Sequence, residues 1–191
     1  MEQIVSEFKN HKAILAWDIK NEPDLDFENR TKENVTEWLS QMVKEIKKYD
    51  PNHLVTIGWS SIQEAVNLKD EVDFVSYHYY QDIDNFKTRF QQLKKEIPNK
   101  PLVLQEFGVS SYRGVWNPFG YSEKYQANYH KKMQAIFKKD SLAFMSWSLY
   151  DFKFIPVSVA GSFPWRKNKQ KHFGFIDIQG NLKPSFLHIA H

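Results

Sequence analysis

The sequence predicts an α/β protein in which helical crossovers link the strands of a parallel sheet. Apolar runs and amphipathic helices alternate without interruption along the 191 residues. The apolar runs lack polar alternation, which is typical of strands covered on both faces of a parallel sheet. No change of composition, short repeat or low-complexity stretch divides the chain, so we expect residues 1–191 to form a single domain.

Five apolar runs are predicted as strands. They are Ala13–Ile19, Leu54–Ile57, Val72–Tyr77, Leu102–Leu104 and Leu142–Met145, the last extending to about Leu149. The first of them has five aliphatic or alanine positions in seven residues and is expected to be buried on both faces.

Helices are predicted between these strands. The face made by Val35, Trp38, Leu39, Met42, Val43, Ile46 and Tyr49 has helical spacing and stops at Asp50-Pro51. A short helix is expected at 61–68, another around Phe86–Ile97 ending at Pro98, and a long one opened by Ser122. Residues 110–120 and 150–172 are predicted loops, and an apolar run at 173–178, a Gly180-Asn181 turn and a short helix close the chain.

Composition excludes several classes of function. The absence of cysteine rules out disulfides, thiolate metal sites and a thiol nucleophile. A net charge of +3 does not favour a nucleic-acid partner, and the basic stretch 166–171 is interpreted as a solvated loop. No run is long and apolar enough to span a membrane, and residues 1–12 do not resemble a secretory signal. Dinucleotide and phosphate-loop motifs, close metal-ligand spacing and a nucleophile elbow are all missing, so we expect no cofactor and no metal.

Functional side chains follow all five predicted strands. In chain order these are Asn21 and Glu22, Trp59, His78 and Tyr80, Glu106, and Trp147. The carboxyl ends of the strands in a (β/α) barrel share one rim, where active sites are built. Taken singly, the tryptophans are also typical of a core and a lone histidine of a structural role. Glu106 favours function, because a carboxylate directly after three aliphatic residues is desolvated unless it is paired or used.

Two carboxylates on one rim indicate glycoside cleavage, which needs one protonated and one ionised carboxyl group. Aromatic side chains beside them match the apolar faces of a sugar ring. The segment Ala16–Asp24 (AWDIKNEPD) resembles the fourth-strand acid/base motif of glycoside hydrolase clan A, and Leu104–Gly108 (LQEFG) resembles its seventh-strand nucleophile motif. Further similar segments are Ser76–Tyr80 (sixth strand), Phe144–Ser148 (eighth strand), and Phe173–Asp177 with Gly180–Pro184 (the closing segment of family 5 cellulases and mannanases).

This resemblance implies a retaining glycoside hydrolase that cleaves β-linked poly- or oligosaccharides such as glucan or mannan. Glu22 would be the general acid/base and Glu106 the nucleophile, with their carboxyl groups about 5–5.5 Å apart. The implied substrate-binding residues are Asn21 at the sugar 2-hydroxyl, Tyr80 beside the nucleophile, His78 in the same subsite, Trp147 under the ring, and Trp59.

The same resemblance implies a partial TIM barrel, because the chain matches strands four to eight of a (β/α)8 barrel and residues 1–12 match the end of helix three. The family's arginine on strand two and histidine on strand three have no counterpart. We therefore expect a fragment, or one half of a split enzyme whose other polypeptide supplies strands one to three. Self-association is less favoured, since two copies give ten strands rather than eight.

A catalytically silent carbohydrate-binding half-barrel and a structural half-barrel remain alternatives. If the chain is a fragment of a secreted glycosidase, its location is extracellular or periplasmic.

Overall fold

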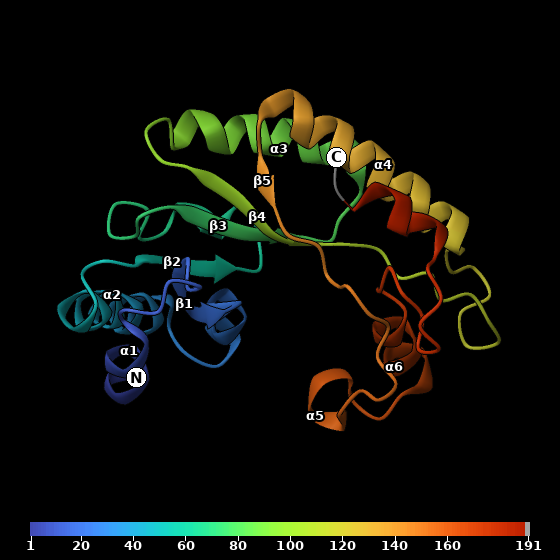
Figure 1. The fold of residues 1–191 in the computed structure, drawn as a ribbon, viewed down its shortest axis with the longest axis horizontal. Helices are drawn as coiled ribbons and strands as arrows, with labels where there is room; N and C mark the ends of the chain where they lie inside the picture. The colour runs from blue at the N-terminus through green and yellow to red at the C-terminus, as the bar shows by residue number, and fades with distance from the viewer. Residues whose placement is uncertain (190–191) are drawn as a thin grey trace. The chain divides into compact units, whose positions relative to one another are not determined.

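The computed structural model describes residues 1–189, which divide into two compact units. Unit 1 comprises Met1–Tyr79 and Asp84–Gln105, and unit 2 comprises Tyr80–Ile83 and the chain from Glu106 onward. The strands form a five-stranded sheet in the order β1-β2-β3-β4-β5, and the β1–β2 and β2–β3 pairs are parallel (Figure 1). This confirms the predicted α/β class and the sequential strand order.

Unit 1 consists of strands that alternate with helices. Its elements are α1 (Glu2–Phe8), β1 (Ala16–Asn21), the 3-10 helix η1 (Pro23–Glu28), α2 (Lys32–Tyr49), β2 (Leu54–Trp59), the 3-10 helix η2 (Glu64–Val66), β3 (Val75–Tyr79), α3 (Ile83–Glu96) and β4 (Leu102–Phe107). The first residue of α3 and the last two of β4 belong to unit 2.

Helix α2 follows the predicted pattern closely. The side chain of Thr31 accepts a hydrogen bond from the backbone N–H of Asn34, which caps the amino end, and the helix ends before Asp50. Its buried residues are Val35, Leu39, Val43 and Ile46, on the face that lies against β1 and β2. Trp38, which we expected on this face, is exposed.

The strands of unit 1 differ in burial. Every residue of β3 is buried, and so are all residues of β2 except Leu54. The prediction of a doubly buried first strand is wrong: β1 begins at Ala16, ends at Asn21 and exposes Asp18 and Asn21. The reason is its position: β1 is the first strand of the sheet order and therefore an edge strand, which among the described residues pairs with β2 alone.

Unit 2 is built around α4 (Glu123–Asp140) and the end of β4. Ser122 caps α4 by accepting a hydrogen bond from the backbone N–H of Tyr125, as its place before the helix predicts. The remaining elements are β5 (Ala143–Phe144), α5 (Val157–Ala160), α6 (Pro164–Lys171) and the 3-10 helix η3 (Pro184–His188), which lies beside α4 (Figure 1). Phe107 is fully buried against the rings of Tyr129, His130, Phe137 and Phe144.

Three predicted elements are corrected by the structure. The fifth strand is only Ala143–Phe144, because the chain then leaves the sheet with a single further bond from Trp147 N–H to Phe107 O. The expected loop at 150–172 contains α5 and α6, the latter opened by Pro164 at a first-turn position, where proline favours a helix. The helix expected at 61–68 is only the single turn η2.

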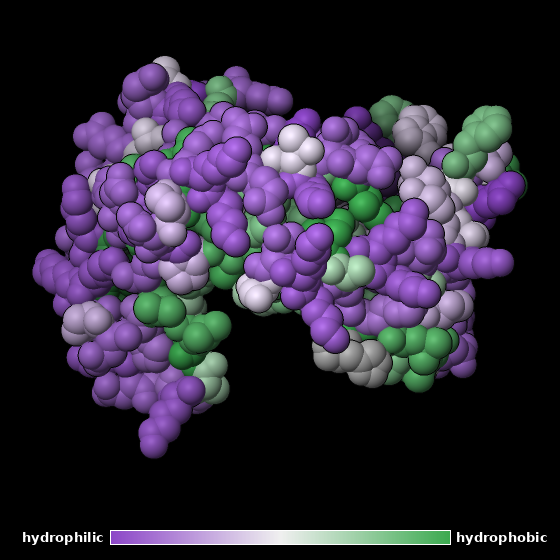
Figure 2. All heavy atoms as spheres, turned by 90° about the horizontal axis from the view of Figure 1, so that it is seen from above, coloured by the Kyte–Doolittle hydropathy of each residue, from purple (hydrophilic) through white to green (hydrophobic). Residues whose placement is uncertain are grey.

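The face of the molecule drawn in Figure 2 is largely polar. Figure 2 shows hydrophilic side chains over most of one face, with hydrophobic residues between them. Within residues 1–189, no helix combines the length and the apolar character that crossing a bilayer requires.

Candidate active site

Glu22 stands at the exit of β1 in a strained backbone conformation. The register of β1 against β2 shifts between Asp18 and Asn21, immediately before this residue. Glu22 has φ 50° and ψ 52°, the left-handed region that residues with a side chain rarely adopt. Its N–H donates to Gly58 O at 2.7 Å, which holds the turn. An observed strain of this kind is often found at functional positions.

The carboxylate of Glu22 is held by a histidine from β3. His78 Nδ1 lies 3.0 Å from Glu22 Oε1, and the His78 residue is only 1% exposed. Because the imidazole is enclosed by the strand core, its ring orientation is fixed, and the hydrogen bond fixes the direction of the carboxylate as well. The structure therefore brings together two residues that the sequence analysis placed after different strands.

Two further polar side chains lie on the strands of unit 1 and were missed by the sequence analysis. Asp18 Oδ2 accepts a hydrogen bond from Gln105 Nε2 at 2.7 Å, and Asp18 Oδ1 accepts one from Gly58 N–H at 3.0 Å. Although Asp18 is exposed as a residue, the protein atoms around its carboxyl group desolvate it and raise its pKa, while these hydrogen bonds and the nearby His78 act in the opposite direction. The signal that could have revealed this pair was one polar residue inside an apolar run, Asp18, and one directly after another run, Gln105.

The other expected residues of unit 1 differ in accessibility. Asn21 is exposed at the end of β1, and Trp59 at the end of β2 is 2% exposed. Next to Trp59, Ser60 donates from both its N–H and its hydroxyl to Asp24, at 2.8 and 2.6 Å. Asn21 thus offers an amide to a ligand, whereas Trp59 and His78 offer little surface.

In unit 2, Glu106 occupies the end of β4. The Tyr80 hydroxyl donates to Glu106 Oε2 at 2.7 Å, so this pair has the hydrogen bond that the resemblance implies. Tyr80 is 41% exposed, and its ring meets the edge of Phe173 at a centroid distance of 6.0 Å and an interplanar angle of 87°. The Tyr80 ring is therefore in contact with the chain's closing segment.

Trp147 follows the short strand β5 and is 36% exposed. Its ring stacks on Phe152 at 5.6 Å with an interplanar angle of 29°. The peptide bond from Trp147 to Ser148 is cis. A Cβ added to Gly108 would lie 2.3 Å from Trp147 O, so only glycine allows the chain after Glu106 to approach this closely.

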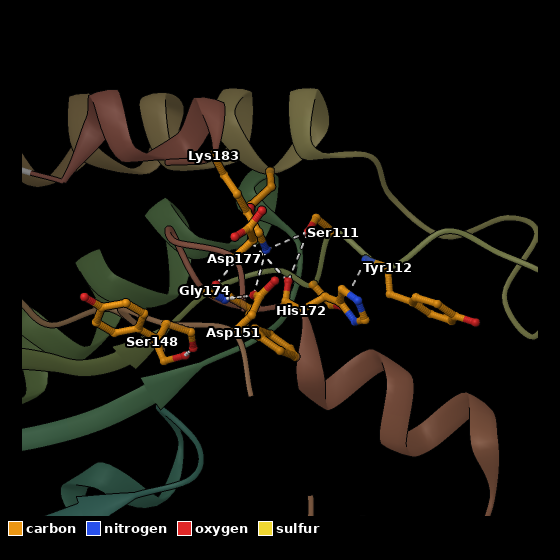
Figure 3. Close-up of polar contacts among 12 residues, drawn as sticks. Ser111, Tyr112, Ser148, Asp151, His172, Gly174, Asp177 and Lys183 are labelled. Atoms are coloured by element: carbon orange, nitrogen blue, oxygen red, sulfur yellow. Dashed lines mark hydrogen bonds and ion pairs between the residues drawn. The ribbon is translucent and has the colours of Figure 1, made fainter. Parts of the chain in front are cut away.

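Unit 2 also contains a buried ion pair, formed by Lys183 and Asp151. Lys183 Nζ is 2.7 Å from Asp151 Oδ1, and their side chains are 2% and 4% exposed (Figure 3). Lys183 also donates to the Ser111 hydroxyl at 3.1 Å. The sequence analysis placed Lys183 in the closing segment but gave it no role, because its partner lies 32 residues away.

Each unit thus carries one glutamate fixed by a hydrogen bond from a ring-bearing side chain. An ordered carboxylate at a strand end is suited to proton transfer or to nucleophilic attack. The expected separation of the Glu22 and Glu106 carboxyl groups stays a prediction, since the two residues belong to different units.

Comparisons with known proteins agree on the kind of protein. The family model for cellulase, glycosyl hydrolase family 5, matches residues 1–153. Human (Homo sapiens) β-glucuronidase is 26% identical over 168 residues, which cover 80% of this chain and 25% of that protein. Endoglucanase H of Acetivibrio thermocellus is 31% identical over 135 residues, covering 58% of this chain and 15% of that one. Mannan endo-1,4-beta-mannosidase 1 of Solanum lycopersicum is 27% identical over 159 residues, covering 58% and 39%.

Solved structures support the fold. The β-glucuronidase of Faecalibacterium prausnitzii superposes with a TM-score of 0.76 at 16% identity, covering 98% of this chain and 33% of that one. A β-galacturonidase from Eisenbergiella tayi, bound to galacturonate, gives 0.75 at 23% identity, covering 98% and 34%. The chain spans about a quarter of the length of the curated β-glucuronidases it matches.

Proposed function

Because the chain belongs to glycosyl hydrolase family 5, the cellulase family whose model matches residues 1–153, we propose that it carries the two catalytic carboxylates of a retaining β-glycosidase. The observation that carries this proposal is the ordered Glu106 carboxylate at the end of β4, which accepts the Tyr80 hydroxyl at 2.7 Å. This hydrogen bond fixes the direction of the carboxylate that would act as the nucleophile.

The reaction proceeds in two displacements. Glu106 attacks the anomeric carbon while the bond to the leaving oxygen breaks, and Glu22 gives that oxygen its proton. In the second step Glu22 takes a proton from water, whose oxygen attacks the anomeric carbon and releases Glu106. Asn21 binds the 2-hydroxyl of the sugar, and Trp147 stacks on its ring. Tyr80 completes the binding site, whereas His78 acts through its contact with Glu22 and the buried Trp59 offers little surface to a sugar.

We further propose that the five strands are strands four to eight of a (β/α)8 barrel. The sequential strand order and the place of each functional residue at a strand end support this assignment. Strands one to three come from another polypeptide or from a further part of the same protein. The chain tested alone is then nearly inactive, because misplacing a catalytic group by about 1 Å can cost on the order of 100-fold.

The substrate is a β-linked glucan, mannan or related oligosaccharide. Support comes from relatives named as an endoglucanase and as mannan endo-1,4-beta-mannosidases. Other relatives are named β-glucuronidases, so 4-nitrophenyl β-glucuronide belongs in the test panel beside the β-glucoside and the β-mannoside.

The test compares hydrolysis of these three glycosides by the chain, with and without a polypeptide that supplies strands one to three. We expect turnover only in the mixture, and its loss with Glu106→Ala or Glu22→Ala. Glu28→Ala, a matched control at the exposed end of η1, should keep full activity. A 2-deoxy-2-fluoro glycoside should label the peptide that contains Glu106. Labelling elsewhere contradicts the assignment of the nucleophile, and sugar binding without turnover in the mixture favours the silent alternative.

A further inference from the structure

The side chains of the Asp151–Lys183 ion pair in unit 2 are almost fully buried. Its two charged atoms are 2.7 Å apart, and Asp151 Oδ1 also accepts the Gly174 N–H at 2.8 Å (Figure 3). Removing two charges from water costs free energy that their attraction only partly returns, so a buried pair is weak evidence for stability. Its better-attested use is to specify one arrangement of the segments that it joins.

On one side, the pair fixes the segment that carries Trp147. Asp151 lies four residues after this tryptophan, and its N–H donates to Ile176 O at 2.8 Å. The next residue, Phe152, stacks on the Trp147 ring and donates its N–H to Lys171 O at 3.0 Å. The aromatic side chain that would support the sugar is therefore anchored through residues 151–152.

On the other side, the pair fixes the segment His172–Phe173, whose phenylalanine ring contacts Tyr80. Lys183 Nζ donates to the Ser111 hydroxyl at 3.1 Å, and Ser111 donates from its N–H to His172 O at 2.9 Å. The residue after His172 is Phe173, whose ring supports Tyr80. Tyr80 in turn donates to Glu106.

The segments joined by the pair lie in close contact. A Cβ added to Gly174 would lie 2.2 Å from Asp151 N, so only glycine fits there. Beyond Phe144 the bonds to residues 171–176 are isolated ones rather than a regular ladder. In such a region, directional bonds from a charged pair can set a register that strand pairing does not.

We propose that Asp151 and Lys183 are positioning residues that hold Trp147 and Tyr80 in place around Glu106. This inference rests on the proposed function, because it assigns the pair to the binding site of the same glutamate. The lysine acts through contacts in unit 2 and does not itself touch substrate.

The test exploits the absence of cysteine in the sequence. Lys183→Cys is alkylated in denaturant and refolded in two forms: with bromoethylamine, which rebuilds a lysine-like ammonium, and with iodoacetamide, which leaves an uncharged amide. The two preparations differ mainly by one charge. The chain carries 5-fluorotryptophan and 3-fluorotyrosine, and the Trp147 and Tyr80 signals are assigned with Trp147→Phe and Tyr80→Phe.

We expect the aminoethylated form to restore the native fluorine shifts of Trp147 and Tyr80, and the amide form to shift or split both signals. Trp17 and Trp59, which belong to unit 1, should keep native shifts in both forms. Lys169→Met, which removes an exposed charge from α6, should change neither signal. In an active mixture with strands one to three, the amide form should lose about 100-fold in kcat/KM, the cost of a 1 Å displacement.

Native Trp147 and Tyr80 signals in the amide form overturn the proposal, and so does failure of the aminoethylated form to restore them. A general loss of fold in the amide form, seen as altered Trp17 and Trp59 signals, also contradicts it, because the role is then structural. The fluorine signals need no turnover. A chain that cleaves no glycoside therefore counts against the proposed function and leaves this result standing.

Discussion

The two units hold their glutamates in different ways. In unit 1, the partner of Glu22 is His78, enclosed within the fully buried strand β3. In unit 2, the partner of Glu106 is Tyr80, which lies just beyond that strand, is partly exposed, and is supported by a ring from the closing segment. The first glutamate depends on a regular strand core, and the second depends on irregular chain fixed by isolated contacts.

The difference extends to what stabilises each unit. Unit 1 is mostly regular strand and helix. Its core combines aliphatic side chains with buried aromatic rings, and it buries one acid, Asp50, at the end of α2. Unit 2 centres on aromatic rings and also buries His130 and Lys183. Both units thus bury polar groups. Those of unit 1 include Thr56 on β2 and His78 on β3, whereas Lys183 of unit 2 lies outside any strand or helix.

The largest expected effect is loss of the aromatic core of unit 2. Phe107→Ala removes a fully buried ring that contacts four other rings, and we expect it to lower the free energy of unfolding by about 3–5 kcal/mol. Urea unfolding followed by circular dichroism measures this. Phe119→Ala, at a phenylalanine that is 95% exposed, is the control and should change stability by less than about 0.5 kcal/mol. Equal effects at both positions would contradict the described core.

The second effect is acid sensitivity of unit 2. Burial, together with a smaller effect of the nearby His188, lowers the pKa of His130 to about 3. Neither ring nitrogen of His130 has a hydrogen-bond partner within the described residues 1–189. An unfolded histidine takes up its proton near pH 6.5, so between pH 6.5 and about 3 the unfolded state binds more protons, and stability falls as pH falls.

We expect protonation of His130 in the unfolded state to lower the free energy of unfolding by on the order of 1 kcal/mol per pH unit below about pH 6. Urea midpoints of the native chain and of His130→Phe, measured at pH 7 and pH 4.5, test it. The variant should lose much less stability on acidification, and an equal loss in both proteins would show that another group is responsible.

The third effect concerns the buried acid of unit 1, Asp50. Burial acts to raise the pKa of Asp50, but hydrogen bonds from Trp17 and from the His53 backbone and ring outweigh it and lower the pKa to about 2. The stability from this carboxylate is therefore present above about pH 3.8 and is lost as pH falls towards 2.

Asp50→Asn should lower stability at neutral pH by about 2 kcal/mol and flatten its dependence on pH between 4 and 2. Hydrogen exchange resolved by residue should place the change in unit 1. Asp70→Asn, at an exposed position, serves as the control and should leave the acid dependence unchanged. A loss of protection confined to unit 2 would contradict the assignment.

The sequence predicted the regular part of the fold and the strand-end residues for physical reasons. The stop of α2 at Asp50 and the start of α4 at Ser122 depend on a few neighbouring residues, which a sequence displays. The Asp151–Lys183 pair, the enclosure of His130 by aromatic rings, and the two-residue length of β5 depend on contacts between distant segments. Local pattern contains no signal for these, and they are concentrated in unit 2.

The smallest expected effect isolates the backbone strain at Glu22. Both Glu22→Ala and Glu22→Gly remove the carboxylate and its bond to His78, so the difference between them reports only the backbone. Because φ is +50° at this position, we expect the glycine variant to be more stable than the alanine variant by about 1 kcal/mol in urea unfolding. The same pair of substitutions at Lys20, inside β1, should give the opposite order, since glycine weakens a strand by roughly 0.5–1 kcal/mol. Alanine more stable than glycine at both positions would mean that Glu22 bears no strain, and the unit 1 glutamate would then be held by His78 alone.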